Sequence, residues 1–305
     1  MASNLKTTDS LNKELREDLL DIITDISPTA TPIYSTLGKS TATASIHQWL
    51  KDSVSRATAV NTYAEGSDVA DRVLVNPSRG TNYVQEVVKR WNVSQKQEDS
   101  LSAGYSSAEA YYKAKALKEW KVDVEYALLW GTGISGVSGT SYEMTGLRKS
   151  ITTNFTSMPS GATVTSTLFN NWMEALFDYN TDLTFNVYSS MRVKRGISAF
   201  TTSNTKNVNA ADNRVIEKIS VYEADTGTFN LFPHNDIPGG SKTGAGTLGT
   251  LLAINPDAFK IAFLHKPEFM DLPASGAYKG GYVYGSMTLE ARDEKGGVRV
   301  DQVLG

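Results

Sequence analysis

Residues 106–130 read SSAEAYYKAKALKEWKVDVEYALLW and carry the strongest secondary-structure signal in the chain. Ser106 followed by Glu109 matches the capping box that begins many helices, and glycine follows at 131. Apolar residues recur at helical spacing through the stretch, at Ala110, Ala114, Leu117, Trp120, Val124, Ala127 and Leu128. The pattern predicts one helix of about 38 Å, long enough to be the spine of the molecule.

Two β-like segments precede this helix, at residues 46–52 and 82–95. The second is rich in Tyr, Val and Trp, and its alternation places Tyr83 and Trp91 on one face. We expect the two segments to form a ribbon, and a two-stranded ribbon is only marginally stable alone in water. It should therefore lie either along a larger sheet of its own domain or across a neighbouring subunit. In the second case Trp49, Tyr83 and Trp91 are expected at the interface.

A shorter amphipathic helix is predicted near the start of the chain, at residues 10–26. Its apolar stripe consists of Leu11, Leu15, Leu19, Ile22, Ile23 and Ile26. Pro28 ends it, because the residue before a proline is pushed out of the α region. The stripe needs a partner, which is either its own domain or a neighbouring subunit. We expect Leu11, Leu15 and Leu19 to be assembly contacts in the latter arrangement.

Helices and strands alternate downstream of the spine helix. We expect helices at 166–180 and 191–200 and strands at 183–188, 214–222, 228–232 and 250–254. This alternation is typical of a compact α/β unit. The last two strand-like segments, 282–291 and 298–303, predict a closing hairpin around residues 293–297.

Composition excludes several classes of function. The chain has 305 residues, no cysteine and only three histidines, at positions 47, 234 and 265. Disulfides and thiolate metal sites are therefore excluded, and a site built on a pair of histidines is disfavoured. The net charge of −3 disfavours a surface built to bind nucleic acid through its phosphates. We expect neither a signal peptide nor a membrane span, and folding in the cytoplasm.

The motifs that usually carry catalysis are missing or misplaced. Gly131, Gly133 and Gly136 match the spacing of a dinucleotide fingerprint. That fingerprint needs a strand before it and a helix after it, whereas here a long helix precedes it and a loop follows. No G-x-S-x-G nucleophile elbow is present. We therefore expect no catalytic residue, no cofactor and no metal, and a protein that is not an enzyme.

Seven short stretches occur in an informative order: DISPTATPI at 25–33, GK at 38–39, HQW at 47–49, TNYVQ at 81–85, AKALKEWKVDVEYALL at 114–129, DLPASG at 271–276 and LEAR at 289–292. Together they resemble the phage SU-ten-like major capsid protein family, which has the Hong Kong 97-type capsid fold. The similarity covers nearly the whole chain in collinear order.

The resemblance implies an α+β fold of five parts. Residues 1–44 would be the N-arm, 45–98 the extended β-hairpin E-loop, and 99–165 the P-domain with the spine helix. Residues 166–265 would be the α/β A-domain, and 266–305 the closing strands of the P-domain.

The resemblance also implies a function. The protein would be a major capsid protein that self-assembles as pentamers and hexamers into the icosahedral head of a tailed phage (Caudoviricetes). That head encloses double-stranded DNA without sequence-specific binding. The implied partners are copies of the same chain and separate scaffold, portal and decoration proteins, with no membrane. The protein would reside in the virion after assembly in the host cytoplasm.

Two other readings remain open. An encapsulin-type nanocompartment shell shares the fold but packages enzymes. A soluble hydrolase or glycan-binding protein built on an α/β unit would instead be a monomer with a ligand pocket.

Overall fold

The computed structural model describes residues 30–54, 62, 64–68, 76–100, 104–136, 140–159, 164–179, 184–200, 220–224, 226–237, 249–273 and 276–303. The helix predicted at 10–26, with Leu11, Leu15 and Leu19, lies outside the described residues, and so does most of the strand predicted at 214–222.

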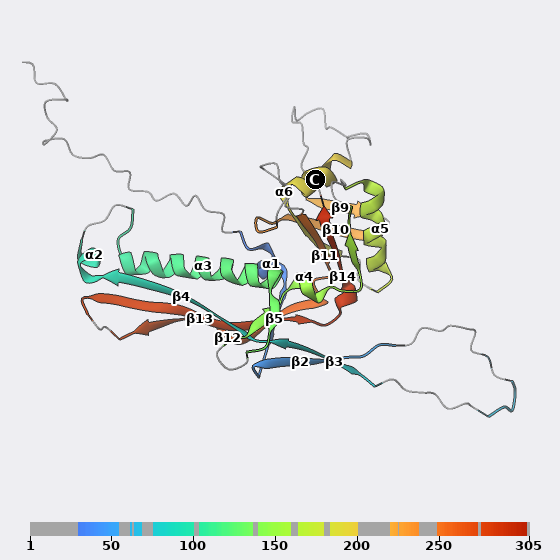
Figure 1. Cartoon of the computed structure of the whole chain (residues 1–305), viewed down its shortest axis with the longest axis horizontal. Coiled ribbons are helices and arrows are strands. Elements are labelled where there is room, and N and C mark those ends of the chain that lie inside the picture. Colours follow the sequence, from blue (N-terminus) through green and yellow to red (C-terminus); the bar gives the residue numbers. More distant parts are fainter. Residues whose placement is uncertain are drawn as a thin grey trace, which may run out of the picture.

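A four-stranded sheet forms the long axis of the body (Figure 1). Its order is β1 (Gly38–Thr41), β12 (Phe259–Leu272), β13 (Tyr278–Ala291) and β4 (Gln85–Ser94). β1 runs parallel to β12, and the other neighbours are antiparallel. Helix α3 (Ala108–Trp130) lies along one face of this sheet. The core between them contains Val87, Trp91, Trp120, Val124, Leu128, Val283, Met287 and Leu289.

The spine helix is confirmed, but the details of its start are not. The helix begins at Ala108, and Ser107 caps it by accepting a hydrogen bond from the amide of Ala110 at 3.2 Å. The predicted capping box is therefore wrong. Glu98, next to the end of α2 (Gln95–Asp99), instead accepts hydrogen bonds from the Ser107 hydroxyl at 2.8 Å and the Glu109 amide at 2.9 Å. A carboxylate from a preceding helix thus satisfies a further amide in the first turn of α3.

A six-stranded sheet forms the second layer. Its order is β7 (Phe155–Ser157), β14 (Gly297–Val303), β11 (Gly249–Ile254), β8 (Thr184–Ser189), β10 (Gly227–Pro233) and β9 (Val221–Ala224). The central strands β8 and β11 are buried on both faces. Phe185, Val187, Leu251 and Ala253 pack with α5 (Ser166–Phe177) and α6 (Met191–Ala199). The alternate residues Tyr188, Leu252 and Ile254 join the core of the spine helix instead.

Short elements connect the two layers. Helix α1 (Pro32–Thr36) precedes β1, and α4 (Leu147–Ser150) follows a small two-stranded sheet of β5 (Thr132–Ile134) and β6 (Glu143–Thr145). The 3₁₀ helix η3 (Glu294–Gly296) links β13 to β14. Trp120 on α3 is fully buried, and its indole N–H donates to the carbonyl of Val87 at 2.9 Å.

The predicted ribbon exists, but its second strand is β3 and not the segment expected at residues 82–95. β2 (Ile46–Lys51) pairs with β3 (Ser78–Tyr83), and β4 belongs to the four-stranded sheet. β4 buries Val87, Trp91 and Val93, so it needs a sheet with one covered face. The ribbon of β2 and β3 extends away from the body (Figure 1).

The predicted closing hairpin is also wrong. β13 pairs with β12 and β4, so both of its edges are largely occupied, whereas β14 pairs with β11 and β7 in the other sheet. The turn at η3 therefore carries the chain from one sheet to the other.

The strands of each sheet come from several of the five expected parts of the chain. The boundary at 265 falls inside β12, and β14, within 266–305, completes the six-stranded sheet. β7, within 99–165, is an edge strand of that same sheet. β1, within 1–44, is part of the four-stranded sheet.

We predict that Glu294 contributes stability that disappears in acid. Its carboxylate accepts four hydrogen bonds, from the amide and hydroxyl groups of Thr152 and Thr153. Partial burial raises the pKa of Glu294, but these hydrogen bonds outweigh it and lower the pKa to about 2. Because the folded pKa lies below the unfolded value, the stabilisation is complete above the unfolded pKa, which is about 4.3. It is lost as the pH falls towards 2.

The measurement is urea denaturation of unassembled subunits at several pH values between 7 and 3. Glu294→Gln should be less stable than the original chain at pH 7, and the difference should shrink below pH 4.5 or so. An equal difference at every pH would contradict the prediction.

Candidate assembly surfaces and the junction that positions them

A buried carboxylate joins the spine helix to the start of the described chain. Glu125 on α3 is 1% exposed. Its Oε1 accepts a hydrogen bond from the amide of Ile33 and its Oε2 accepts one from the amide of Tyr34, both at 2.7 Å. These amides lie in the first turn of α1, where no carbonyl of the helix can accept from them. The spine helix thus caps α1 from the side.

The same carboxylate reaches the six-stranded sheet through His234, which follows β10. The Nε2 of His234 lies 2.9 Å from the Glu125 Oε1, and both side chains are buried. The Nδ1 of His234 accepts from the amide of Asp236 at 3.1 Å, so the ring proton must be on Nε2 and is donated to Glu125. Glu125 therefore holds three segments in one place, and we refer to this set of contacts as the Glu125 junction.

Neighbouring side chains surround the Glu125 junction. Tyr188 on β8 hydrogen-bonds Thr36 on α1, and burial raises the pKa of Tyr188 to about 12. Lys39 lies with its ammonium 4.0 Å from the centre of the Tyr34 ring. Desolvation lowers the pKa of Lys39 to about 8, and the Glu125 carboxylate opposes that shift. Tyr188 is therefore neutral at pH 7, and the Lys39 ammonium adds a positive charge near the Glu125 junction.

The ribbon beyond this body has two unlike faces. Ile46, Gln48 and Leu50 alternate with His47, Trp49 and Lys51, and the first three are the more exposed. Leu50 is 72% exposed, and Val54, just beyond the strand, is 92% exposed. Trp49 lies over Gly80 of the opposite strand, where a Cβ would come within 2.5 Å of the indole ring. A side chain at position 80 would therefore push the Trp49 ring away from the opposite strand.

The three aromatic residues expected at an interface occupy different environments. Trp91 is 5% exposed, lies in the core beneath α3 and is covered by the Lys113 ammonium 4.7 Å from its ring centre. Trp49 is half-buried at the base of the ribbon. Tyr83 is half-buried, and its ring centre lies 5.8 Å from that of Tyr142. The structure does not bring them together, and Trp91 supports the fold of its own subunit.

The residues that sequence reasoning missed are Glu125, His234, Leu50 and Val54. Glu125 had a detectable signal, because it is a carboxylate between Val124 and Leu128 in the buried part of the spine helix. His234 gave no signal, because its partner is 109 residues away in the sequence. Leu50 and Val54 gave no signal, because a single apolar residue in a strand pattern does not show whether it is covered.

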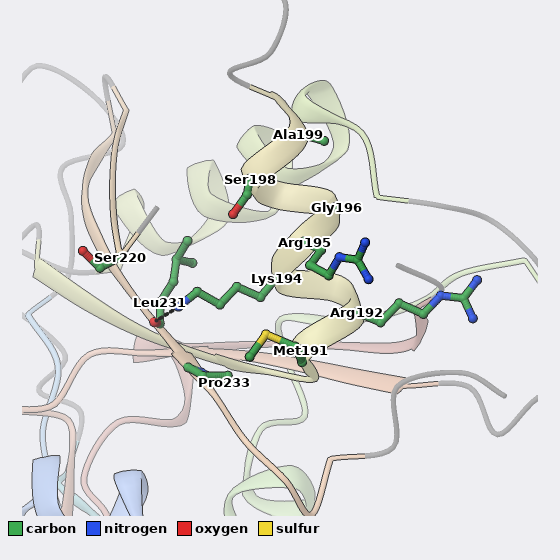
Figure 2. A pocket seen from close by; sticks show the side chains of 10 residues that line it. All are labelled: Met191, Arg192, Lys194, Arg195, Gly196, Ser198, Ala199, Ser220, Leu231 and Pro233. Carbon is green, nitrogen blue, oxygen red and sulfur yellow. Dashed lines mark hydrogen bonds between the residues drawn. The ribbon is translucent and has the colours of Figure 1, made fainter. Parts of the chain in front are cut away.

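A cavity of about 1020 Å³ lies beside α6 (Figure 2). Its described lining residues are Met191, Arg192, Lys194, Arg195, Gly196, Ser198, Ala199, Ser220, Leu231 and Pro233. Lys194 reaches across it and donates to the carbonyl of Leu231 at 3.2 Å, whereas Arg192 and Arg195 point away from that contact. No Asp, Glu or His occurs among these lining residues.

The described residues offer neither a cluster of metal ligands nor a membrane-spanning helix. No described group of three or more His, Cys, Asp or Glu side chains is arranged to hold a metal ion. None of the helices within the described ranges is long and apolar enough to cross a membrane.

Comparison with known families decides the identity. The model of the SU10 major capsid protein family matches residues 3–303. The chain belongs to this family. It is a major capsid protein of a tailed phage, and its place is the virion. No curated protein matches the sequence.

Solved capsid structures share the fold of this capsid protein. It aligns over 97% of its length with 98% of the capsid protein of an empty GTA particle, with a TM-score of 0.68 and 10% identity. For the capsid of cyanophage A-1(L) the coverages are 98% and 99%, the TM-score is 0.66 and the identity is 10%. For the holo-SrpI encapsulin of Synechococcus elongatus PCC 7942 the coverages are 98% of this chain and 96% of that chain, the TM-score is 0.60 and the identity is 10%. The α+β, Hong Kong 97-type fold is therefore confirmed.

We predict that the Glu125 junction is essential to the stability of the subunit. Glu125→Ala would leave three buried donors without an acceptor, and each such group costs about 1–3 kcal/mol. The free energy of unfolding should fall by about 3 kcal/mol or more. Glu125→Gln keeps one carbonyl acceptor and should lose less.

The measurement is urea denaturation of unassembled subunits followed by tryptophan fluorescence. Glu119→Gln is the matched control, because Glu119 lies on the same helix outside the junction, and it should change stability by no more than about 0.5 kcal/mol. Equal stabilities for Glu125→Ala and the control would refute the role of the junction.

Proposed function

We propose that this capsid protein assembles with its own copies into pentamers and hexamers, and that these close into an icosahedral shell around double-stranded DNA. The observation that carries the proposal is the ribbon of β2 and β3, which projects from the body with exposed apolar side chains at Leu50 and Val54. A short two-stranded ribbon gains stability when a neighbour covers it.

Small contacts suffice when they are repeated. Among the described residues of the ribbon, Ile46, Leu50 and Val54 are exposed apolar positions, far fewer than the roughly 20–30 residues that each partner contributes to a standard stable interface. In a ring or shell each subunit both offers its ribbon and receives one, so many weak contacts act together. The GTA capsid that shares this fold was solved with five-fold symmetry, which supports five-fold rings for this chain as well.

The N-terminal arm is proposed as a second linking element. Leu11, Leu15 and Leu19 share one face of a helical pattern and would dock on a neighbouring subunit. Trp49 and Tyr83, half-buried at the base of the ribbon, would complete the interface once a neighbour covers them.

The charge of the chain supports a wall that encloses DNA without gripping it. The net charge is −3, so the wall would not neutralise packaged phosphates, and mobile cations would do so. Separate scaffold, portal and decoration proteins would complete the particle, with assembly in the host cytoplasm. The role is structural and requires no cofactor and no catalysis.

The encapsulin-type shell is the second candidate, because the SrpI encapsulin shares the fold. Particles purified from a phage lysate would separate the two, since a phage head contains nuclease-protected DNA and a nanocompartment contains an enzyme. The hydrolase alternative predicts a monomer, which size-exclusion chromatography would identify.

We predict that Leu50→Ser leaves the subunit folded and lowers the yield of particles or capsomer rings several-fold. The side chain is exposed in the single subunit, so its loss removes an intersubunit contact and changes unfolding by less than about 0.5 kcal/mol. Negative-stain microscopy and size-exclusion chromatography measure the yield.

Gln48→Ser is the matched control, because Gln48 lies on the same exposed face two residues away and is polar. Particle yield should be unchanged in this control. A normal yield from Leu50→Ser would remove the ribbon from the assembly interface, and the absence of any particles from the unchanged protein would count against the shell itself.

A further inference from the structure

One rung at the base of the ribbon carries polar contacts from both strands to the body. His47 on β2 lies directly opposite Asn82 on β3. The Asn82 side-chain amide donates to the carbonyl of Leu289 at 2.7 Å and to that of Thr145 at 3.1 Å. Its Oδ1 accepts from the amide of Thr145 at 2.8 Å. The β3 side of the rung is thus tied to main-chain groups of β13 and β6.

The β2 side of the rung meets a buried carboxylate. The buried Nε2 of His47 lies 3.4 Å from the Oε2 of Glu290, which is 5% exposed, a polar contact that is longer than a hydrogen bond. The Ser40 hydroxyl donates to the Glu290 Oε2 at 2.6 Å, and the Arg292 guanidinium donates to Oε1 at 2.7 Å. Burial raises the pKa of Glu290, but these partners outweigh it and leave the pKa below its usual range. The carboxylate is therefore charged when it meets His47.

Two successive residues of β13 consequently hold the two strands of the ribbon. Leu289 holds β3 through its carbonyl, and Glu290 contacts β2 through its side chain. A ribbon fixed at one strand can still tilt about that point, whereas attachment at both strands fixes its direction. In the described chain β2 pairs only with β3, and the contact of His47 with Glu290 and the packing of Trp49 against the core attach β2 to the body.

We propose that Glu290 is a positioning residue for shell assembly, which sets the direction of the ribbon through His47 and ties that direction to β1 through Ser40. The inference rests on the proposed function, in which the ribbon contacts a neighbouring subunit. Leu50 lies three residues beyond His47, about 10 Å along the strand. A rotation of about 30° at the rung would displace Leu50 by about 5 Å, enough to separate it from a packed partner.

The chain contains no cysteine, so the direction of the ribbon can be measured with two introduced labels. Leu50→Cys on the ribbon and Tyr126→Cys on the spine helix are both exposed positions. With a spin label on each cysteine, double electron–electron resonance then gives the distribution of distances between the labels in unassembled subunits. Particle yield is measured separately, with each test substitution made in the chain that lacks the two cysteines and the labels.

Glu290→Gln and His47→Leu should each shift or broaden the distance distribution by about 5 Å and lower the particle yield several-fold. His47→Gln keeps a donor for Glu290 and should restore most of both readouts. Gln48→Ser, on the opposite face of the ribbon, is the control and should change neither.

The decisive readout is the distance distribution, because a purely structural residue would lower the melting temperature without moving the ribbon. An unchanged distribution and a normal yield in His47→Leu overturn the proposal, even if Glu290→Gln fails to fold. If the unchanged protein forms no particles, the proposed function fails, while the distance measurement still tests the role of Glu290.

Discussion

The fold depends on a carboxylate that has no access to water. Burying a carboxylate is costly unless hydrogen-bond donors surround it. At Glu125 the donors come from two amides of α1 and from His234 beyond β10, so their segments must be in place together. The interaction therefore joins the spine helix, the start of the described chain and the six-stranded sheet in one arrangement, and the direction in which the ribbon projects is defined relative to that body.

The sequence predicted the local elements well and the pairing of strands poorly. The spine helix, α5, α6 and most strands follow from periodicity and local capping, which depend on residues a few positions apart. Pairing depends on residues far apart: β1 lies beside β12 and β7 beside β14. Sequential proximity suggested that β13 and β14 form a hairpin, but β13 was already paired along both edges. The predicted capping box of α3 failed partly for this reason, because Ser107 is the N-cap and the second acceptor is Glu98 from another helix.

The candidate interface residues show a limit of choosing aromatic side chains. Large aromatic residues bury more surface than any others, so the sequence alone does not tell a core position from an interface. Trp91 went into the core under α3, while Leu50 and Val54, which have smaller side chains, remained exposed. Membership of the capsid family was predictable because it rests on the order of many short motifs. The Glu125 junction was not, because His234 became informative only when the fold placed it beside the spine helix.

A rigid attachment of the ribbon matters because association must offset the ordering of each partner. Immobilising a flexible segment costs free energy at every contact, and a shell repeats the same contact in every copy. A ribbon that already points in one direction avoids that cost. The exposed apolar side chains are few and the ribbon carries Lys51 and Arg79, which limits indiscriminate pairing of strand edges. The rung at His47 and Asn82 thus holds the ribbon firmly at its base and leaves its apolar side chains exposed beyond it. A weak contact that is repeated in every copy needs this combination.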